Sequence, residues 1–306
     1  MNAITLDNIS KSFEKIQALD QVTFNVKEGE LFGLIGPDGA GKTTLFRILT
    51  TLMLADSGVA SVMGNDVEKD FKNIRKEIGY MPGKFSLYQD LTVEENLNFF
   101  ATLFGTTVKD SYDLIKDIYS QIEPFKKRRA GKLSGGMKQK LALSCALVHK
   151  PKVLFLDEPT TGVDAVSRKE FWEILQSLKA QGITILVSTP YMDEALQCER
   201  IALIQKGKIM QIDSPQGIIQ QYPKNLYAVK GEKQYQLLKY FRNLREIESV
   251  FAFGESLHIT LNNISTHQLK EKVENEMSLS IEIKKIQPNI EDVFIRLTHD
   301  FELLNP

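Results

Sequence analysis

The sequence is poor in cysteine and has no long apolar run. Only Cys145 and Cys198 occur among 306 residues, which excludes a disulfide framework or a cysteine metal site and indicates a reducing compartment. No run of about 18 apolar residues is present, so the sequence predicts no membrane-spanning helix. Residues 1–7 lack the basic and apolar segments of a secretory signal. The sequence therefore predicts a cytosolic protein, and we expect any contact with a membrane to go through a partner.

The sequence also has no excess of charge of either sign. It contains 38 lysine and arginine residues against 39 aspartate and glutamate residues, so no overall basic surface predicts nucleic acid as a partner. The one basic run, Lys126–Arg129, is interpreted as a solvated helix end. With 306 residues, the chain is long enough for one large domain and a smaller one.

A glycine-rich loop fits the pattern G-x-x-x-x-G-K-[ST] at every defining position. Glycine lets backbone N–H groups turn inward and approach phosphate oxygens, because a Cβ would obstruct both. Lys42 adds a positive charge toward the outer phosphates, and the hydroxyl of Thr43 suits a magnesium ion. The loop joins a strand-like run, 31–35, to a helix predicted over 42–52, whose amino end favours anions. The residues expected to bind a nucleoside triphosphate here are Gly36, Pro37, Asp38, Gly39, Ala40, Gly41, Lys42, Thr43 and Thr44.

The apolar pattern predicts an α/β fold. Strand-like runs alternate with helical stretches, which indicates right-handed crossovers in a mostly parallel, buried sheet. Beyond residue 223 the order becomes β-α-β-β-α-β with a closing helix, which predicts a small split-βαβ domain. The strands predicted in the first part are 4–9, 22–26, 31–35, 153–156, 183–187, 201–204 and 208–212, with mainly helical sequence over 91–150 and a helix over 167–179. Those predicted in the second part are strands 225–230, 249–253, 257–261 and 279–286 and helices 234–246, 266–275 and 290–297.

Two carboxylates, Asp157 and Glu158, follow the apolar run 153–156. A buried strand that ends in acids needs a reason, because unpaired buried charges cost several kcal/mol. Asp157 can accept a hydrogen bond from magnesium-bound water, and Glu158 can polarise the water that attacks a γ-phosphate. The alternative is two acids that simply emerge into solvent, which the phosphate loop upstream disfavours.

A second anion site is predicted at Ser134, Gly135 and Gly136, where a hydroxyl and two glycines open a helix. One phosphate loop does not need a second such site in its own chain. The order L-S-G-G-x-[KRQ]-Q over 133–139 resembles the signature of ATP-binding cassette (ABC) ATPases. In that family two subunits face head to tail, and each signature caps the nucleotide held by the other. An isolated serine-capped helix is the alternative, and the position between the phosphate loop and the acid pair argues against it.

The resemblance extends over residues 3–215. It implies a P-loop ABC cassette over 1–222, with a parallel-sheet core, an antiparallel β subdomain and a helical subdomain at about 85–150. It also implies a small ferredoxin-like accessory or dimerisation domain over 223–306. Phe13 stands where the family carries an aromatic residue that stacks on adenine, and Asp164 where its aspartate communicates across the dimer.

Two segments resemble the ABC-2-type exporters. They are the switch segment 188–195 and the tail 288–294, which resembles the end of the drug and polysaccharide export ATPases of that branch. The stretch 85–96 matches the part of the family's sequence that leads into the surface receiving the membrane subunit. The resemblance implies an ATPase that uses ATP and Mg²⁺ and pairs with an identical or different second cassette. It also implies ABC-2-type transmembrane subunits and a peripheral, cytoplasmic location on the inner face of the cell membrane. The residues that select the cargo would be on another chain.

Two positions depart from the family pattern. Gly83 replaces the glutamine that touches magnesium and the attacking water, and Pro190 replaces the histidine that contacts the γ-phosphate and organises Glu158. Glycine has no side chain for that role, and proline donates no hydrogen bond. Losing a positioning residue costs on the order of 10²-fold in rate, so we expect ATP binding with slow hydrolysis at this chain's own phosphate loop. The intact signature at Ser134 can still complete a competent site on a partner.

Two other functions fit parts of the sequence. Gly83 and Pro190 are also compatible with an ATP-sensing regulatory subunit that binds nucleotide with little turnover. A non-transport ABC ATPase acting on ribosomes or DNA is the second alternative. Such proteins typically carry two cassettes in one chain or a long inserted coiled coil, and the sequence contains neither.

Overall fold

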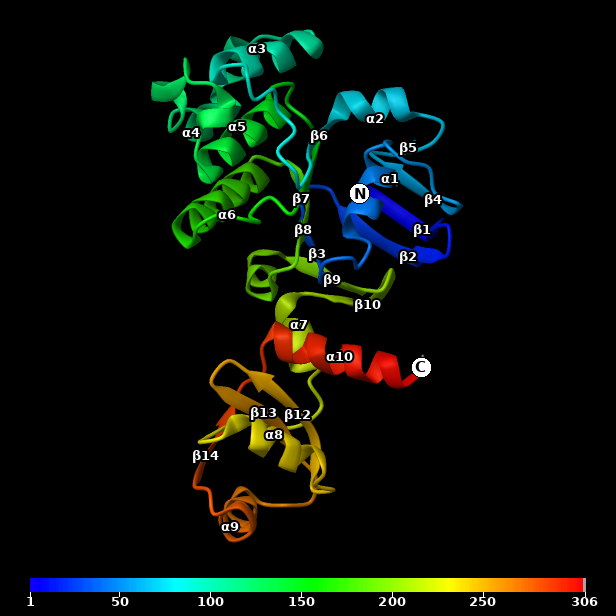
Figure 1. Cartoon of the computed structure of the whole chain (residues 1–306). Coiled ribbons are helices and arrows are strands. Elements are labelled where there is room, and N and C mark those ends of the chain that lie inside the picture. The colour runs from blue at the N-terminus through cyan, green and yellow to red at the C-terminus, as the bar shows by residue number, and fades with distance from the viewer. Residues whose placement is uncertain (305–306) are drawn as a thin grey trace. The chain divides into compact units, whose positions relative to one another are not determined.

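A computed structural model describes residues 1–304, and the chain divides into two compact units (Figure 1). The first unit spans Met1–Gln216 and takes in the chain end from Asp300, and the second spans Gly217–His299. The division lies at 216/217, whereas the sequence pattern placed it at 222/223. Helix α7 (Pro215–Gln220) crosses this point, so composition alone does not mark it.

A six-stranded sheet forms the centre of the first unit. Its strands are β3 (Leu31–Ile35), β6 (Ile78–Met81), β7 (Val153–Asp157), β8 (Thr184–Thr189), β9 (Arg200–Gln205) and β10 (Lys208–Asp213). The order is β10-β9-β3-β8-β7-β6, and only β10 is antiparallel to its neighbour. Strands β3, β7 and β8 are buried along their whole length, as is typical of a parallel sheet covered on both faces. Their carboxyl ends share one edge of the sheet, which is where such sheets bind ligands.

An antiparallel sheet of four strands shares the hydrophobic core of the first unit. Its strands are β1 (Asn2–Phe13), β2 (Ile16–Lys27), β4 (Ser57–Val62) and β5 (Asn65–Asp66), in the order β2-β1-β4-β5. Phe24 of β2 stacks on Phe32 of β3 with 5.3 Å between ring centroids. Phe46 of helix α1 (Lys42–Leu49) meets Phe155 of β7 edge-on. The sequence pattern predicted the middle part of β1 and the last part of β2 but did not predict β4, β5 or β6.

Helices make up the rest of the first unit, and most begin at a side-chain cap. They are α2 (Phe71–Glu77), α3 (Val93–Leu103), α4 (Val108–Tyr119), α5 (Gly135–Leu147) and α6 (Ala165–Ala180), with short 3-10 turns η1 (Glu123–Phe125), η2 (Ala130–Lys132) and η3 (Met192–Gln197). Thr92 and Glu95 form a capping box at α3, and Thr107 caps α4. Helices α3, α4 and α5 pack on one another as a separate helical part of this unit (Figure 1).

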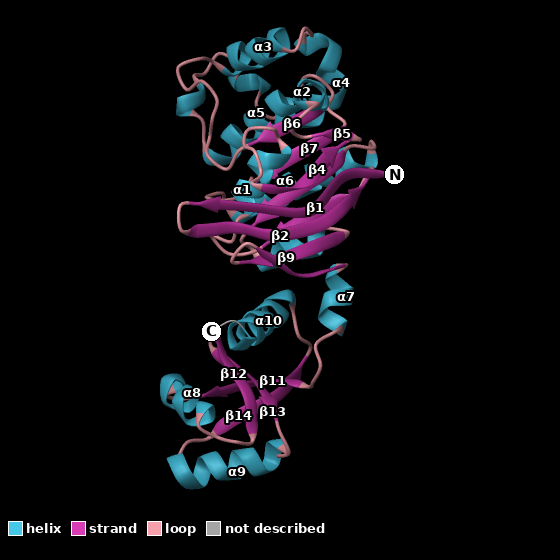
Figure 2. Cartoon of the chain, turned by 90° about the vertical axis from the view of Figure 1, so that its right-hand side faces the viewer, coloured by secondary structure: helices cyan, strands magenta, loops and turns pink. Residues whose placement is uncertain are grey.

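The second unit has a split-βαβ topology. Its elements are β11 (Leu226–Gly231), α8 (Gln234–Arg242), β12 (Ile247–Phe253), β13 (Ser256–Leu261), α9 (Thr266–Met277), β14 (Ile281–Ile286) and α10 (Ile290–Leu304). The sheet order is β12-β13-β11-β14 with every pair antiparallel, as in ferredoxin-like folds. Leu237 and Phe241 of α8 and Leu269 of α9 are buried in the core of this unit. Figure 2 shows both helices next to the strands of the sheet. The order of elements agrees with the pattern in the sequence.

Candidate nucleotide site

The phosphate loop connects β3 to α1 at the carboxyl edge of the central sheet. Two of its glycines are required by their surroundings. A Cβ at Gly36 would collide with the carbonyl oxygen of Ile204, and a Cβ at Gly41 would collide with that of Ala18. Gly41 also has a φ of 105°, which L side chains rarely adopt. The loop backbone is therefore held against two neighbouring segments, while Asp38 and Gly39 remain exposed.

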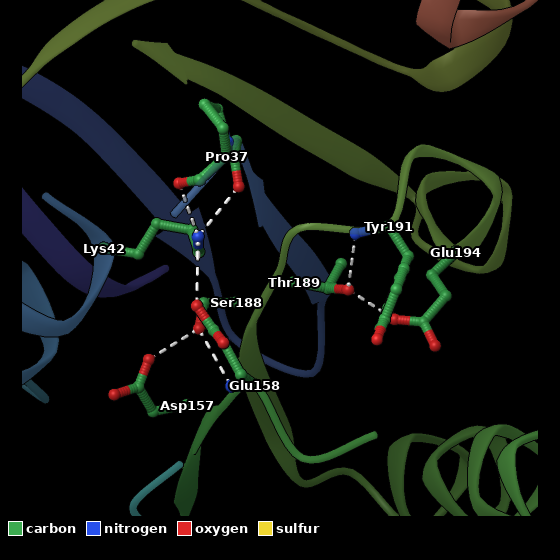
Figure 3. A network of polar contacts seen from close by, with 9 residues as sticks. Pro37, Lys42, Asp157, Glu158, Ser188, Thr189, Tyr191 and Glu194 are labelled. Carbon is green, nitrogen blue, oxygen red and sulfur yellow. Dashed lines mark hydrogen bonds and ion pairs between the residues drawn. The ribbon is translucent and has the colours of Figure 1, made fainter. Parts of the chain in front are cut away.

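The Lys42 side chain is buried and already oriented within the loop. Its Nζ donates hydrogen bonds to the carbonyl oxygens of Gly36 at 2.8 Å and Pro37 at 2.9 Å, and lies 3.0 Å from Oε1 of Glu158 (Figure 3). Thr43 and Thr44 follow in the first turn of α1 and are half-buried. A buried ammonium group at a helix amino end is a strong attraction for phosphate oxygens.

Asp157 and Glu158 end β7 and lie at the same edge as Lys42. Asp157 accepts a hydrogen bond from the hydroxyl of Ser188 at 2.7 Å, and the backbone N–H of Glu158 donates to the same hydroxyl at 3.0 Å. Glu158 has a φ of 52°, a left-handed conformation that costs a non-glycine residue about 1 kcal/mol or more. Burial and then the charge of Asp157 raise the pKa of Tyr80, on the adjacent strand β6, to about 12. The two acids are thus fixed side by side, Asp157 buried and Glu158 facing Lys42.

The signature serine and Asp164 both cap helices. Ser134 accepts a hydrogen bond from the N–H of Met137 and so caps α5. Asp164 caps α6, and hydrogen bonds from the backbone and side chain of Ser167 hold the pKa of its carboxyl below the usual value. A Cβ at Gly136 would lie 2.8 Å from Oγ of Ser167, so the two helix amino ends are packed together. Ser134, Gly135 and Asp164 remain exposed and available to another molecule.

Phe13 ends β1 and is 43% exposed. The ammonium group of Lys11 lies 5.8 Å from the centroid of its ring. The ring is therefore not a core residue, and its exposed face can accept a planar group by stacking.

The two departures lie on either side of the acid pair. Gly83 follows β6, and a Cβ there would lie 3.0 Å from the carbonyl oxygen of Asp157. A cavity of about 170 Å³ lies beside it, lined in part by Lys138, Glu158 and Gly162. Pro190 follows β8, in the order β8-β7-β6, so Gly83 and Pro190 follow the two strands that flank β7, and neither residue has a polar side chain.

Sequence reasoning gave no separate role to Ser188, Thr189 and Glu194. Glu194 lies in η3, and its Oε2 accepts hydrogen bonds from Thr189 and Thr160. The only sequence signal for these residues was their place in the switch segment.

The sequence also did not predict an apolar groove, although Ser86 and Leu87 of the stretch 85–96 line it. The groove has a volume of about 570 Å³ and is lined mainly by side chains of β6, α3 and α5. The imidazole of His149 stacks on Phe104 and hydrogen-bonds the carbonyl oxygen of Ile78, while burial lowers the pKa of His149. Further lining residues include Leu52, Leu87, Phe100 and Leu103.

Residues 1–304 contain no preformed metal cluster and no helix that could span a membrane. No group of three or more histidine, cysteine, aspartate or glutamate side chains in this range is placed to hold a metal ion. The hydroxyl of Thr43 and the carboxylate of Asp157 remain a donor set suited to Mg²⁺, which needs only one or two protein oxygens beside phosphate. None of the helices in this range is long and apolar enough to cross a membrane.

Comparisons with known proteins identify the family of the chain. A model of the ABC transporter family matches residues 19–161, which include the phosphate loop, the signature and the acid pair. The chain is 38% identical over 302 residues to the probable multidrug ABC transporter ATP-binding protein YbhF of Escherichia coli (strain K12). That match covers 96% of this chain but 52% of YbhF, so the chain spans about half the length of this relative.

A second relative matches along nearly its whole length. The Nod factor export ATP-binding protein I of Rhizobium sp. (strain N33) is 34% identical over 300 residues, with 97% of both chains covered. Among solved structures, the dimeric bacterial ABC transporter cassette MJ0796 superposes with a TM-score of 0.63 at 26% identity, over 69% of this chain and 98% of that one. An ATP-binding subunit of an ABC transporter gives a TM-score of 0.66 at 27% identity, over 72% of this chain and 93% of that one. The chain therefore belongs to the family of ABC transporter ATP-binding proteins.

Proposed function

We propose that this chain is the nucleotide-binding subunit of an ABC-2-type exporter, which couples ATP binding and hydrolysis to transport through separate transmembrane subunits. The observation that carries the proposal is the position of Lys42. Its ammonium group is buried, held by two carbonyl oxygens of the phosphate loop, and 3.0 Å from the carboxylate of Glu158. The proximity supports the proposal that Lys42 binds phosphate beside Glu158 as the general base, as phosphoryl transfer to water requires.

Each residue has a distinct part in the proposed reaction. The backbone N–H groups of Gly36–Thr43 and the Lys42 ammonium group bind the phosphates, and Phe13 stacks on the base. Glu158 accepts the proton of the attacking water. Thr43 and Asp157 would hold Mg²⁺, which supplies charge neutralisation on the phosphate oxygens.

A second cassette would complete the site. Ser134, Gly135 and Gly136 present a hydroxyl and a helix amino end to solvent, and Asp164 is exposed beside them. In a head-to-tail pair this surface would cap the nucleotide bound to the partner's phosphate loop. Nucleotide would then close the pair, and hydrolysis would reopen it.

The membrane partner is expected at the apolar groove between β6 and helices α3 and α5. Leu52 and Leu103 are exposed at this groove, and such contiguous apolar surface typically marks an interaction site. A cassette bound there would lie peripherally on the cytoplasmic face of the membrane. Two relatives of this chain carry names that refer to multidrug and Nod factor export, which supports export without identifying the cargo.

The second unit is proposed to aid pairing of two cassettes. It is a complete ferredoxin-like module with β12 and β14 at its sheet edges, and the exposed side of α8 carries Tyr235. Sedimentation of the Tyr235→Glu variant tests this role, because a dimer that forms through α8 would be weakened and would dissociate at a higher protein concentration than the wild-type dimer.

The proposed transport function is tested by purification from membranes and by turnover. Integral membrane proteins should co-purify with the chain, and the assembled complex should hydrolyse ATP faster than the isolated chain. Turnover of the isolated chain should be slow, because neither Gly83 nor Pro190 offers a polar side chain to position the attacking water or the γ-phosphate at Glu158. Glu158→Gln should abolish the part of the ATP turnover that comes from this site. Glu173→Gln, which changes an exposed charge on α6, is the matched control and should leave turnover unchanged.

Gly83 and Pro190 also favour a second candidate, a regulatory subunit that binds ATP without turning it over. If Glu158→Gln leaves the ATP turnover of the complex unchanged but Ser134→Arg lowers it, the regulatory subunit is favoured. Wild-type turnover at an ordinary rate in a homodimer, abolished by Glu158→Gln, would contradict the proposed slow site.

A further inference from the structure

Glu194 is a buried carboxylate that the nucleotide site does not obviously use. It lies in η3, five residues after the end of β8, and is 3% exposed. A carboxylate at that depth costs several kcal/mol unless charge and hydrogen bonds compensate it. The contacts of its two oxygens therefore show which groups stabilise the buried charge.

One oxygen of Glu194 joins two loops of the nucleotide site. Oε2 accepts a hydrogen bond from the hydroxyl of Thr189 at 2.5 Å and another from the hydroxyl of Thr160 at 3.0 Å (Figure 3 draws the first). Thr160 is two residues after Glu158, in the loop that leads from β7 to α6. Thr189 ends β8, and its carbonyl oxygen accepts a hydrogen bond from the N–H of Gly36, the first residue of the phosphate loop. Glu194 thus connects the general-base loop to the phosphate loop through two threonines.

The switch loop is held from the same point. The N–H of Tyr191 donates to the hydroxyl of Thr189 at 3.1 Å, and that hydroxyl donates to Glu194. Thr189 and Tyr191, the two neighbours of Pro190, are therefore linked to Glu194 through this hydroxyl. The guanidinium group of Arg168, on α6, lies over the ring of Tyr191 at 4.3 Å, with its Nε 3.6 Å from Oε1 of Glu194. This ion pair offsets part of the buried charge, and Oε1 of Glu194 accepts no hydrogen bond from the residues that the structure describes.

From these contacts we infer that Glu194 is a positioning residue of the ATP site. It fixes the geometry of the loop carrying Glu158 relative to the phosphate loop, in a chain whose residue 190 has no hydrogen-bond donor. The inference rests on the proposed hydrolysis of ATP at Glu158. It assigns Glu194 no contact with ATP, so the expected effect is on the chemical step and not on nucleotide binding.

Substitution of Glu194 should therefore change the rate of ATP hydrolysis but not the affinity for nucleotide. Glu194→Ala removes the shared acceptor and should lower the hydrolysis rate about 10- to 100-fold, since small displacements of a catalytic group have effects of that size. The nucleotide dissociation constant should stay within about threefold, because Lys42 and the backbone N–H groups of Gly36–Thr43 bind the phosphates. Glu194→Gln keeps an oxygen that both hydroxyls can reach and should recover most of the rate.

The test is single-turnover hydrolysis of trace γ-labelled ATP by excess full-length protein, with nucleotide affinity measured separately. Thr160→Val and Thr189→Val each delete one donor with little change of shape, and they stand in if Glu194→Ala does not fold. Their combined effect should be smaller than the product of the single effects, because both act through the same oxygen. Glu173→Ala, on the exposed side of α6, is the matched control.

A reduced rate at constant affinity, recovered by Glu194→Gln, supports the inference. Wild-type rates in both valine variants would overturn it, as would a rate that falls only in proportion to lost affinity or melting temperature. A wild-type chain that binds ATP but releases no phosphate would overturn the proposed hydrolysis together with this role. If the wild-type chain hydrolyses ATP and the Glu194→Ala variant hydrolyses it at the same rate, only the role of Glu194 is overturned.

Discussion

Removing the charge of Glu158 is expected to tighten nucleotide binding. Lys42 Nζ lies 3.0 Å from Glu158 Oε1, so an incoming phosphate must displace or repel this carboxylate. At that separation, unit charges attract by roughly 5 kcal/mol at an effective dielectric constant of about 20. Glu158 is 22% exposed, so we take the net value of a charge-assisted hydrogen bond, about 1.5–3 kcal/mol. Glu158→Gln should therefore lower the nucleotide dissociation constant about 10- to 100-fold.

Calorimetric titration with ADP measures this effect without interference from hydrolysis. Glu173→Gln removes an exposed charge from α6 and should bind ADP as the wild type does. If Glu158→Gln binds ADP within twofold of the wild type, the ion pair does not compete with phosphate. The account of Lys42 as a cation shared between Glu158 and nucleotide would then be refuted.

Three further substitutions test other parts of the structure. Phe13→Ala should raise the ATP dissociation constant about 5- to 100-fold at unchanged melting temperature, since stacking on a base contributes about 1–3 kcal/mol; fluorescence titration measures it, and equal affinity removes Phe13 from the site. Gly83→Gln with Pro190→His should raise steady-state ATP turnover at least about tenfold. Gly83→Gln alone should gain little and lower the melting temperature, because its Cβ would lie 3.0 Å from the carbonyl oxygen of Asp157. Burial lowers the pKa of His149, so below its usual value of 6.5 the unfolded chain binds a proton that the folded chain does not. Stability should therefore decline as pH falls through about 6.5, and thermal melts between about pH 7.5 and pH 5.5 should show a smaller decline for His149→Gln.

The sequence predicted the phosphate loop from its glycine pattern and the acid pair from the apolar run before it, and each follows a buried strand of continuous apolar residues. β3 and β7 are such strands, and parallel pairing brings their carboxyl ends together. The pattern did not predict β4, an edge-side strand with exposed residues at its start, or the two-residue strand β5. Short, half-exposed strands have too few apolar positions for periodicity to identify them.

Contacts between side chains far apart in the sequence were beyond the same reasoning. The ion pair of Lys42 with Glu158 and the bond of Thr160 to Glu194 depend on how loops fold back over the sheet edge. The residue types permitted these partners but did not select them, because many other carboxylates and hydroxyls are available in the sequence. The apolar groove is similar, since its walls come from β6, α3 and α5, which are separate in the chain.

The sheet order gives the two departures a common consequence. β7 lies between β6 and β8, so Gly83 and Pro190 follow the strands on either side of Glu158. In the proposed mechanism both changes would act on the water and γ-phosphate that Glu158 would face, while Ser134 and Asp164 lie at the amino ends of α5 and α6 and cap them. The losses would therefore fall on the half-site proposed for this chain's own nucleotide and would spare the half that it would offer to a partner. If two cassettes pair head to tail, a partner with both polar residues would hydrolyse the ATP that Ser134 caps, and we expect the two sites of that pair to turn over at unequal rates.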